Sequence, residues 1–97
     1  MSIEVRNNPA EHRYEAWLDG ELAGIAVYEL GTHTIAFVHT EVLPAFEGKG
    51  VGGALAKGAL EDVRAQATHD VLPLCPFIKG YIEKHPGVYD DLVHHRA

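Results

Sequence analysis

A glycine-dense turn near the middle of the chain, Gly48–Gly53, restricts the fold more than any other part of the sequence. Upstream of this turn, strand-like segments are rich in β-branched and aromatic residues, whereas downstream of it apolar residues recur at every fourth position. The recurring residues are Val51, Leu55, Ala59, Val63 and Ala67. This spacing predicts an amphipathic helix from about Gly50 to Gln66. The turn therefore joins a β-rich half to a helical half.

Four strands are predicted before the turn: Ile3–Arg6, His12–Asp19, Glu21–Leu30 and Thr32–Leu43. Asn7-Asn8-Pro9 is expected to break the first of them. Asp19-Gly20 is a strong two-residue hairpin signal, because both central positions of such a turn favour positive φ. Pro44 ends the last strand, since it has no N–H to donate to a ladder. The N-terminal half is therefore predicted to be an antiparallel meander.

A short strand and a second helix are predicted after the amphipathic helix. The apolar run Val71–Leu74 fits a buried strand, and it is expected to lie parallel to Thr32–Leu43 because a helix connects the two. Pro76 suits the first position of a helix, and His85-Pro86-Gly87 stops that helix. The predicted order is β-β-β-β-α-β-α, an α+β fold with a mixed sheet. The 97 residues correspond to a single domain, 1–97.

The composition disfavours several classes of partner. The formal net charge is −6, and an acidic chain repels a phosphate backbone, so nucleic acid is not an expected partner. A cationic or amine-bearing partner suits this charge better, although the acidity has the simpler explanation that it aids solubility. No run approaches the ~20 apolar residues that span a bilayer. The N-terminus lacks a signal-peptide pattern, so no membrane partner is predicted and a cytoplasmic location is expected.

Cys75 is the only cysteine, which excludes an intramolecular disulfide and a zinc site of the Cys-x-x-Cys type. It precedes Pro76 at a predicted helix start, where the pKa of a thiol is lowered, although a lone cysteine is more often a small buried apolar residue. His39 lies in a predicted strand, where a histidine usually pairs with a neighbouring polar group. His94 and His95 have no third ligand at a suitable spacing, so we expect a solvated tail and no metal site.

The glycine turn follows a strand and opens a helix, which directs backbone N–H groups and the positive end of the helix dipole at one point. Glycine lets a phosphate approach the main chain closely, so a phosphate or pyrophosphate is the expected ligand. A P-loop is excluded, because no Ser or Thr follows Lys49 in register. Gly48, Gly50 and Gly53 match the letters of a dinucleotide-binding motif, but an antiparallel meander does not fit that fold. A tight turn without any ligand remains an alternative.

The segment Glu47-Gly48-Lys49-Gly50-Val51-Gly52 resembles the Gln/Arg-x-x-Gly-x-Gly/Ala coenzyme A motif of the GCN5-related N-acetyltransferases, with Glu47 in place of the Gln or Arg. More narrowly, the chain resembles a branch of small, stripped-down proteins within that superfamily. The matching segments are His39-Thr40-Glu41-Val42, Gly48–Gly52, Cys75-Pro76-Phe77 and Tyr81-Ile82-Glu83-Lys84-His85-Pro86. The resemblance implies an acetyl-CoA-dependent N-acetyltransferase, with coenzyme A bound between the splayed ends of Thr32–Leu43 and Val71–Cys75.

The resemblance also implies roles for individual residues. The main chain of Val42 and Leu43 would pair with the pantetheine arm, and Lys79 would contact the 3′-phosphate. His39 would act as general base and Cys75 as the acyl-accepting nucleophile. A direct route, in which His39 deprotonates the acceptor and Cys75 only lines the site, is equally compatible. The amides expected to hold the pyrophosphate are those of Gly48, Lys49, Gly50, Gly52 and Gly53.

The expected acceptor is a small-molecule or peptide amine. Larger relatives have long N-terminal helices that help to wall the acceptor site, and these have no counterpart in this sequence. The alternative function is therefore a non-catalytic acyl-CoA-binding or interaction module with the same fold.

Overall fold

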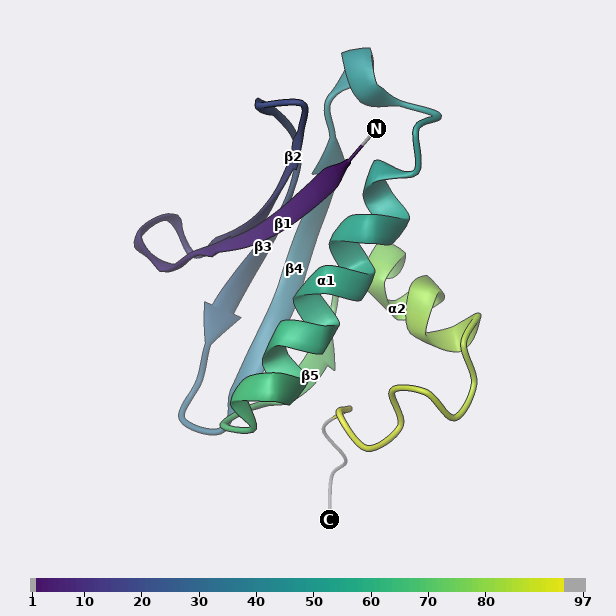
Figure 1. Ribbon diagram of the computed structural model, residues 1–97. Coiled ribbons are helices and arrows are strands. Elements are labelled where there is room, and N and C mark those ends of the chain that lie inside the picture. Colours follow the sequence, from purple (N-terminus) through teal and green to yellow (C-terminus); the bar gives the residue numbers. More distant parts are fainter. Residues whose placement is uncertain (1, 94–97) are drawn as a thin grey trace.

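The computed structural model describes residues 2–93 and contains one five-stranded sheet and two α-helices (Figure 1). The strands lie in chain order and are antiparallel, except that β5 is parallel to β4. They are β1 (Ile3–Asn8), β2 (Arg13–Leu18), β3 (Glu21–Leu30), β4 (Thr34–Val42) and β5 (Asp70–Pro73). The helices are α1 (Val51–Gln66) and α2 (Pro76–Glu83). The predicted α+β fold with a mixed sheet is confirmed.

The first strand is longer than predicted, because Asn7 and Asn8 continue the pairing with β2 instead of breaking it. Both side chains have hydrogen-bond partners. Asn8 Nδ2 donates to Glu15 Oε2 at 2.9 Å, and Asn7 Oδ1 accepts from the Tyr28 hydroxyl at 2.7 Å. The break comes at Pro9, which opens a short 3₁₀ turn, Pro9–Glu11.

Residues with positive φ mark the ends of several elements. Asp19 (50°) and Gly20 (83°) form the predicted hairpin turn between β2 and β3. Gly50 (78°) is the N-cap of α1, and Ala67 (55°) is its C-cap. Ala67 was predicted to extend the apolar face of the helix but is exposed, because its left-handed conformation turns the chain away from the helix axis.

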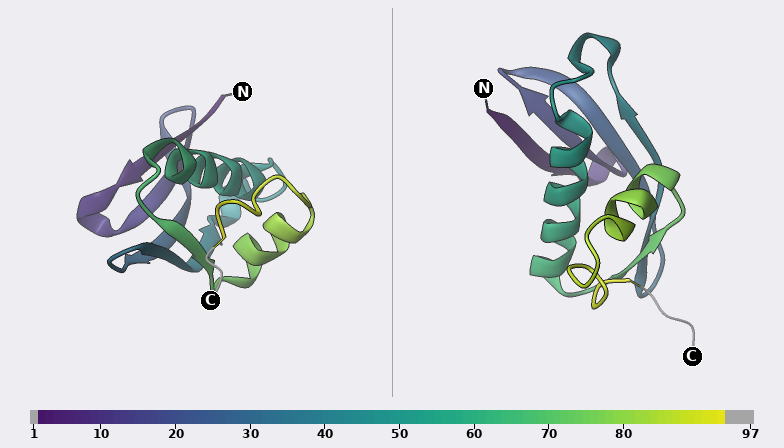
Figure 2. Two further views of the ribbon diagram at one scale, coloured as in Figure 1. Left: turned by 90° about the horizontal axis from the view of Figure 1, so that it is seen from below. Right: turned by 90° about the vertical axis from the view of Figure 1, so that its right-hand side faces the viewer.

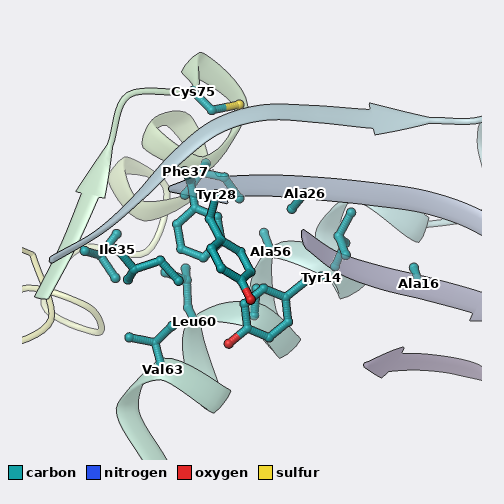
Figure 3. Close-up of a cluster of buried hydrophobic side chains, with 14 of the residues drawn as sticks. Tyr14, Ala16, Ala26, Tyr28, Ile35, Phe37, Ala56, Leu60, Val63 and Cys75 are labelled. Carbon is teal, nitrogen blue, oxygen red and sulfur yellow. The ribbon is translucent and has the colours of Figure 1, made fainter. Parts of the chain in front are cut away.

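Both helices cover the same face of the sheet, α1 across its middle and α2 at the β5 edge (Figure 2). The core lies between this face and the helices. Its members include Tyr14, Ala16 and Leu18 of β2, and also the regularly spaced residues Val51, Leu55, Ala59 and Val63 of α1. Phe37 of β4 is fully buried among them, next to the rings of Tyr14 and Tyr28 (Figure 3). The four-residue spacing of α1 therefore identified its buried face.

The opposite face of the sheet carries a hydrogen-bonded carboxylate, Glu15, which is only 7% exposed. Its oxygens accept bonds from Asn8 Nδ2 at 2.9 Å, Arg13 Nε at 2.9 Å and Trp17 Nε1 at 3.1 Å. These bonds, of which that from Asn8 is the strongest, hold the pKa of Glu15 below its ordinary value although burial opposes them. Trp17 is half-buried on this face, below the Arg6 guanidinium.

The chain returns to the sheet after α2, and Tyr89 and Leu92 are buried there. The N–H of Val71 in β5 donates to the Leu92 carbonyl at 2.8 Å, which ties this segment to the sheet edge. Neither helix within residues 2–93 combines the length and the apolar character that crossing a bilayer requires. His94 and His95 lie outside the described residues.

Candidate functional site

Strands β4 and β5 diverge, as the predicted splayed pair requires. β5 pairs with β4 only from Thr34 to Phe37, and the Cys75 N–H then donates to the Phe37 carbonyl at 2.7 Å. Past this point β4 continues to Val42, whereas the segment that follows β5 turns into α2. Leu74, predicted to belong to the buried strand, is 64% exposed at the divergence. A gap therefore opens beside the C-terminal end of β4, where α2 begins.

The main-chain groups on this edge of β4 alternate in direction. The Leu43 N–H donates to the Ala23 carbonyl at 2.8 Å and so points toward β3. Because neighbouring amides of a strand point to opposite sides, those of Val42 and Thr40 point toward the gap. The approach of the Thr40 N–H to the Cys75 sulfur agrees with this direction. Of the two residues predicted to pair with a pantetheine arm, Val42 has the suitable N–H, and the Leu43 N–H is already used within the sheet.

The glycine turn presents main-chain donors at the start of α1. Gly48 and Gly50 adopt φ of 79° and 78°, in the left-handed region that favours glycine. The first intrahelical bond joins the Ala54 N–H to the Gly50 carbonyl at 3.1 Å. The amides before it have no acceptor within the helix, and they belong to Val51, Gly52 and Gly53. The prediction named the amides of Gly48, Lys49, Gly50, Gly52 and Gly53 and did not include Val51, whose N–H has no helical acceptor because of its position in the first turn.

The space around the turn differs from one glycine to the next. A Cβ added at Gly48, Gly50 or Gly53 would meet no atom within 4 Å, so a ligand has room to approach there. A Cβ at Gly52 would lie 2.8 Å from the Phe77 ring. A Cβ at Gly52 would therefore crowd the Phe77 ring, whereas Gly53 faces open space.

A groove of about 340 Å³ runs between the first turn of α1 and the exposed side of α2. Its walls are formed by Gly53, Pro76, Phe77, Gly80, Tyr81 and Lys84. The Phe77 side chain is 44% exposed, which is unusual for so large an apolar residue. The groove therefore combines the helix N-terminus that attracts anions with an apolar and aromatic wall.

Charged side chains surround the groove unequally. Lys84 lines it, whereas Lys79, predicted to contact a 3′-phosphate, is exposed on α2 outside the lining residues. Glu47 and Lys49 are both exposed beside the glycine turn. Of the two lysines, Lys84 is therefore the one that lines the groove.

A larger cavity, of about 540 Å³, lies at the opposite end of α1. It is lined by polar groups that include Arg64, His69 and Asp91. Arg64 is already paired with Asp91 at 2.7 Å and stacks on the Tyr89 ring. This cavity has neither the unpaired amides nor the strand gap, so its greater volume does not make it the better candidate.

Cys75 is the N-cap of α2 and is 4% exposed, at the margin of the core (Figure 3). Its sulfur lies 3.2 Å from Thr40 Oγ1. Burial raises the pKa of the thiol, but the Thr40 hydroxyl and the N–H groups of Ile78, Phe77 and Thr40 lower it by more in total. The pKa of Cys75 therefore lies below its ordinary value. Thr40 was part of a recognised sequence segment, yet no role had been predicted for it.

His39 lies on the other face of the sheet. It pairs with Val27 and is exposed, whereas its neighbour Thr40 pairs with Ala26, a core residue. Within residues 2–93 no hydrogen bond or ion pair joins His39 to Cys75. The two predicted catalytic residues therefore lie on different faces of the sheet.

The chain is similar to proteins of one family. A family model described as GCN5-related N-acetyl-transferase matches residues 13–92. Protein NATD1 of Xenopus tropicalis is 32% identical over 92 residues, which cover 88% of this chain and 79% of that protein. Protein NATD1 of Gallus gallus is 30% identical over 91 residues, which cover 87% of this chain and 77% of that protein.

Proposed function

This chain belongs to the GCN5-related N-acetyltransferase family, and from that premise we propose that it transfers an acetyl group from acetyl-CoA to an amine. The observation that carries the proposal is the position of the α1 N-terminus. Its first turn, which carries the unpaired amides, borders a groove against α2, and α2 begins where β4 and β5 diverge. A long, anionic donor with an extended arm fits this combination of features.

The donor's pyrophosphate would be held by the first turn of α1. The amides of Val51, Gly52 and Gly53 and the positive end of the helix dipole act together there. Lys49 in the turn and Lys84 on the groove wall add positive charge. The exposed Glu47 can turn its carboxylate into solvent, because no contact fixes it beside the amides.

The pantetheine arm would lie along the free edge of β4, where the Val42 N–H points into the gap. An arm in this position brings the reactive end of the donor toward Cys75 and Thr40. When bound, acetyl-CoA supplies an activated acetyl group, whose carbonyl carbon accepts a nucleophile. The chain itself provides orientation and stabilises negative charge through the N–H groups at the start of α2.

Two routes for the acetyl group follow from the placement of Cys75. In the first, the Cys75 thiolate attacks the acetyl carbonyl carbon and displaces the coenzyme A thiolate. An acceptor amine then attacks acetylated Cys75, which restores the thiolate and releases one proton to a base. In the second, the amine attacks the acetyl carbonyl carbon of the donor directly and displaces the coenzyme A thiolate, and His39 takes the amine proton from the opposite face of the sheet.

Calorimetric titration with acetyl-CoA tests the premise of donor binding. We expect a one-to-one complex, and coenzyme A lacking the acetyl group should bind as well. The absence of measurable heat at millimolar ligand would remove the basis of the proposal. Release of the coenzyme A thiol should then be followed with a panel of polyamines, amino acids and peptides. Tight binding without release in any of them would favour a non-catalytic acyl-CoA-binding module.

Mass spectrometry distinguishes the two routes. After incubation with acetyl-CoA and no acceptor, the two-step route predicts one acetyl group on the peptide that contains Cys75, removable by hydroxylamine. The Cys75→Ala variant should then retain donor affinity and lose turnover. If the wild type turns over but Cys75 is never acetylated, and Cys75→Ala remains active, transfer is direct.

A further inference from the structure

We propose that Thr40 is the positioning residue of Cys75: its hydroxyl holds the sulfur as a thiolate aimed into the gap, and this does not depend on His39. The catalytic meaning of this inference rests on the proposed function. The ionisation it describes is a property of the free protein and can be measured without any substrate.

The contact between the two side chains fixes the direction of the hydrogen bond. Thr40 Oγ1 lies 3.2 Å from the Cys75 sulfur, and in the neutral thiol either atom can donate. A thiolate has no proton, so in the ionised state Thr40 must donate. Hydrogen bonds to an ionised acceptor are stronger than those between neutral groups, so this contact favours the thiolate.

Main-chain donors complete the surroundings of the sulfur. The N–H groups of Phe77 and Ile78 reach it from the first turn of α2, and the Thr40 N–H reaches it from β4. Together with the Thr40 hydroxyl they outweigh the effect of burial, so that the pKa of Cys75 is lowered. The groups that lower the pKa of Cys75 most are all neutral donors. Lys79 on the same helix is exposed, and the glycine turn lies on another element.

His39 cannot supply the same stabilisation from its place in the sheet. The extra residue Val38 resets the alternation of β4, so His39 points to the face away from the helices. Thr40 then points to the helix-covered face, toward Cys75. In this chain the cysteine and the histidine are therefore not an ion pair, unlike the thiolate–imidazolium pairs by which many cysteine nucleophiles are activated.

The experiment is a pH titration of protein labelled with ¹³C at the cysteine β-carbon. Cys75 is the only cysteine, so one resonance reports its ionisation. In Thr40→Val, which is isosteric but lacks the hydroxyl, we expect the thiolate population at neutral pH to fall about tenfold. Thr40→Ser should retain most of it, and His39→Gln should leave the titration midpoint unchanged.

Two results would overturn the inference: a Thr40→Val midpoint equal to that of the wild type, or a midpoint that moves with His39→Gln. Thermal melting of each variant reports the fold, and Thr40→Ala replaces Thr40→Val if the latter does not fold. In the active enzyme, Thr40→Val should lower kcat with little change in acetyl-CoA affinity. If the wild type proves inactive while the titrations differ as expected, the proposed function fails and the role of Thr40 stands.

Discussion

Replacement of Gly53 by alanine should stabilise the free protein and weaken its complex with acetyl-CoA. Gly53 lies in the first turn of α1 with ordinary helical φ, and an added Cβ meets no atom within 4 Å. Alanine is therefore expected to add about 0.5–1 kcal/mol of stability through helix propensity. For a domain of this size that corresponds to a rise in Tm of about 2–8 °C.

The same methyl group occupies the groove that Gly53 lines. Inserting a methyl into a filled contact typically costs about 1–3 kcal/mol, which corresponds to about 5- to 150-fold weaker binding of acetyl-CoA. The assay pairs melting curves, with and without ligand, with calorimetric titration. The diagnostic result is that two quantities change in opposite directions relative to the wild type. The Tm of the free Gly53→Ala variant rises, and the increase in Tm that acetyl-CoA produces becomes smaller.

Ala65→Gly is the matched control, since Ala65 is exposed near the far end of α1. It should lower the Tm by a comparable amount and leave the affinity for acetyl-CoA unchanged. Wild-type affinity in Gly53→Ala would refute the placement of the donor at the first turn of α1. A loss of affinity accompanied by a lower Tm would mean that the turn itself had rearranged, which contradicts the open space described for Gly53.

Three further predictions concern charge and buried polar groups. Glu15→Gln should lower the free energy of unfolding by about 1 kcal/mol at neutral pH. Folding lowers the pKa of Glu15, so the ionised Glu15 carboxylate stabilises the folded state above its ordinary pKa of 4.5, and this stabilisation is lost in more acidic solution. The free energy of unfolding in urea should therefore depend less on pH in this acidic range for Glu15→Gln than for the wild type. Tyr14→Phe removes a 2.6 Å bond to Asp62 and should cost about 1.5–3 kcal/mol in urea unfolding, and no change would contradict a role for this bond. Lys84→Glu should weaken acetyl-CoA binding about fivefold at low salt, and Lys79→Glu should have little effect. A larger loss of affinity in Lys79→Glu than in Lys84→Glu would contradict a 3′-phosphate position beside Lys84.

The sequence predicted the elements of the fold well, because each carried a local signal. The four-residue spacing identified the buried face of α1, and Asp19-Gly20 identified the turn whose positive φ angles the structure contains. The two asparagines of β1 were misread, because their turn-forming tendency is overcome by hydrogen bonds to Glu15 and Tyr28 from later strands. Such partners are distant in sequence, so no local pattern reveals them.

The candidate site was predicted in outline, but its side-chain contacts were not. Backbone donors at a helix start follow from position alone, which is why the turn could be located. The choice between Lys79 and Lys84 depends on how α2 is rotated against α1, where the Phe77 ring lies over Gly52. The sequence contains both partners of this contact, yet nothing in it indicates that they meet.

The bulge in β4 has the largest consequence for the chemistry. Strict alternation from the buried Phe37 would place His39 on the helix-covered face, within reach of Cys75. One extra residue, Val38, reverses that assignment and brings Thr40 to the sulfur. The thiol and the Thr40 hydroxyl then share one face, and the imidazole faces the other. In the proposed reaction, an acceptor that uses His39 would have to reach the acetyl group through the gap between β4 and β5, so this gap would set the size of the amine.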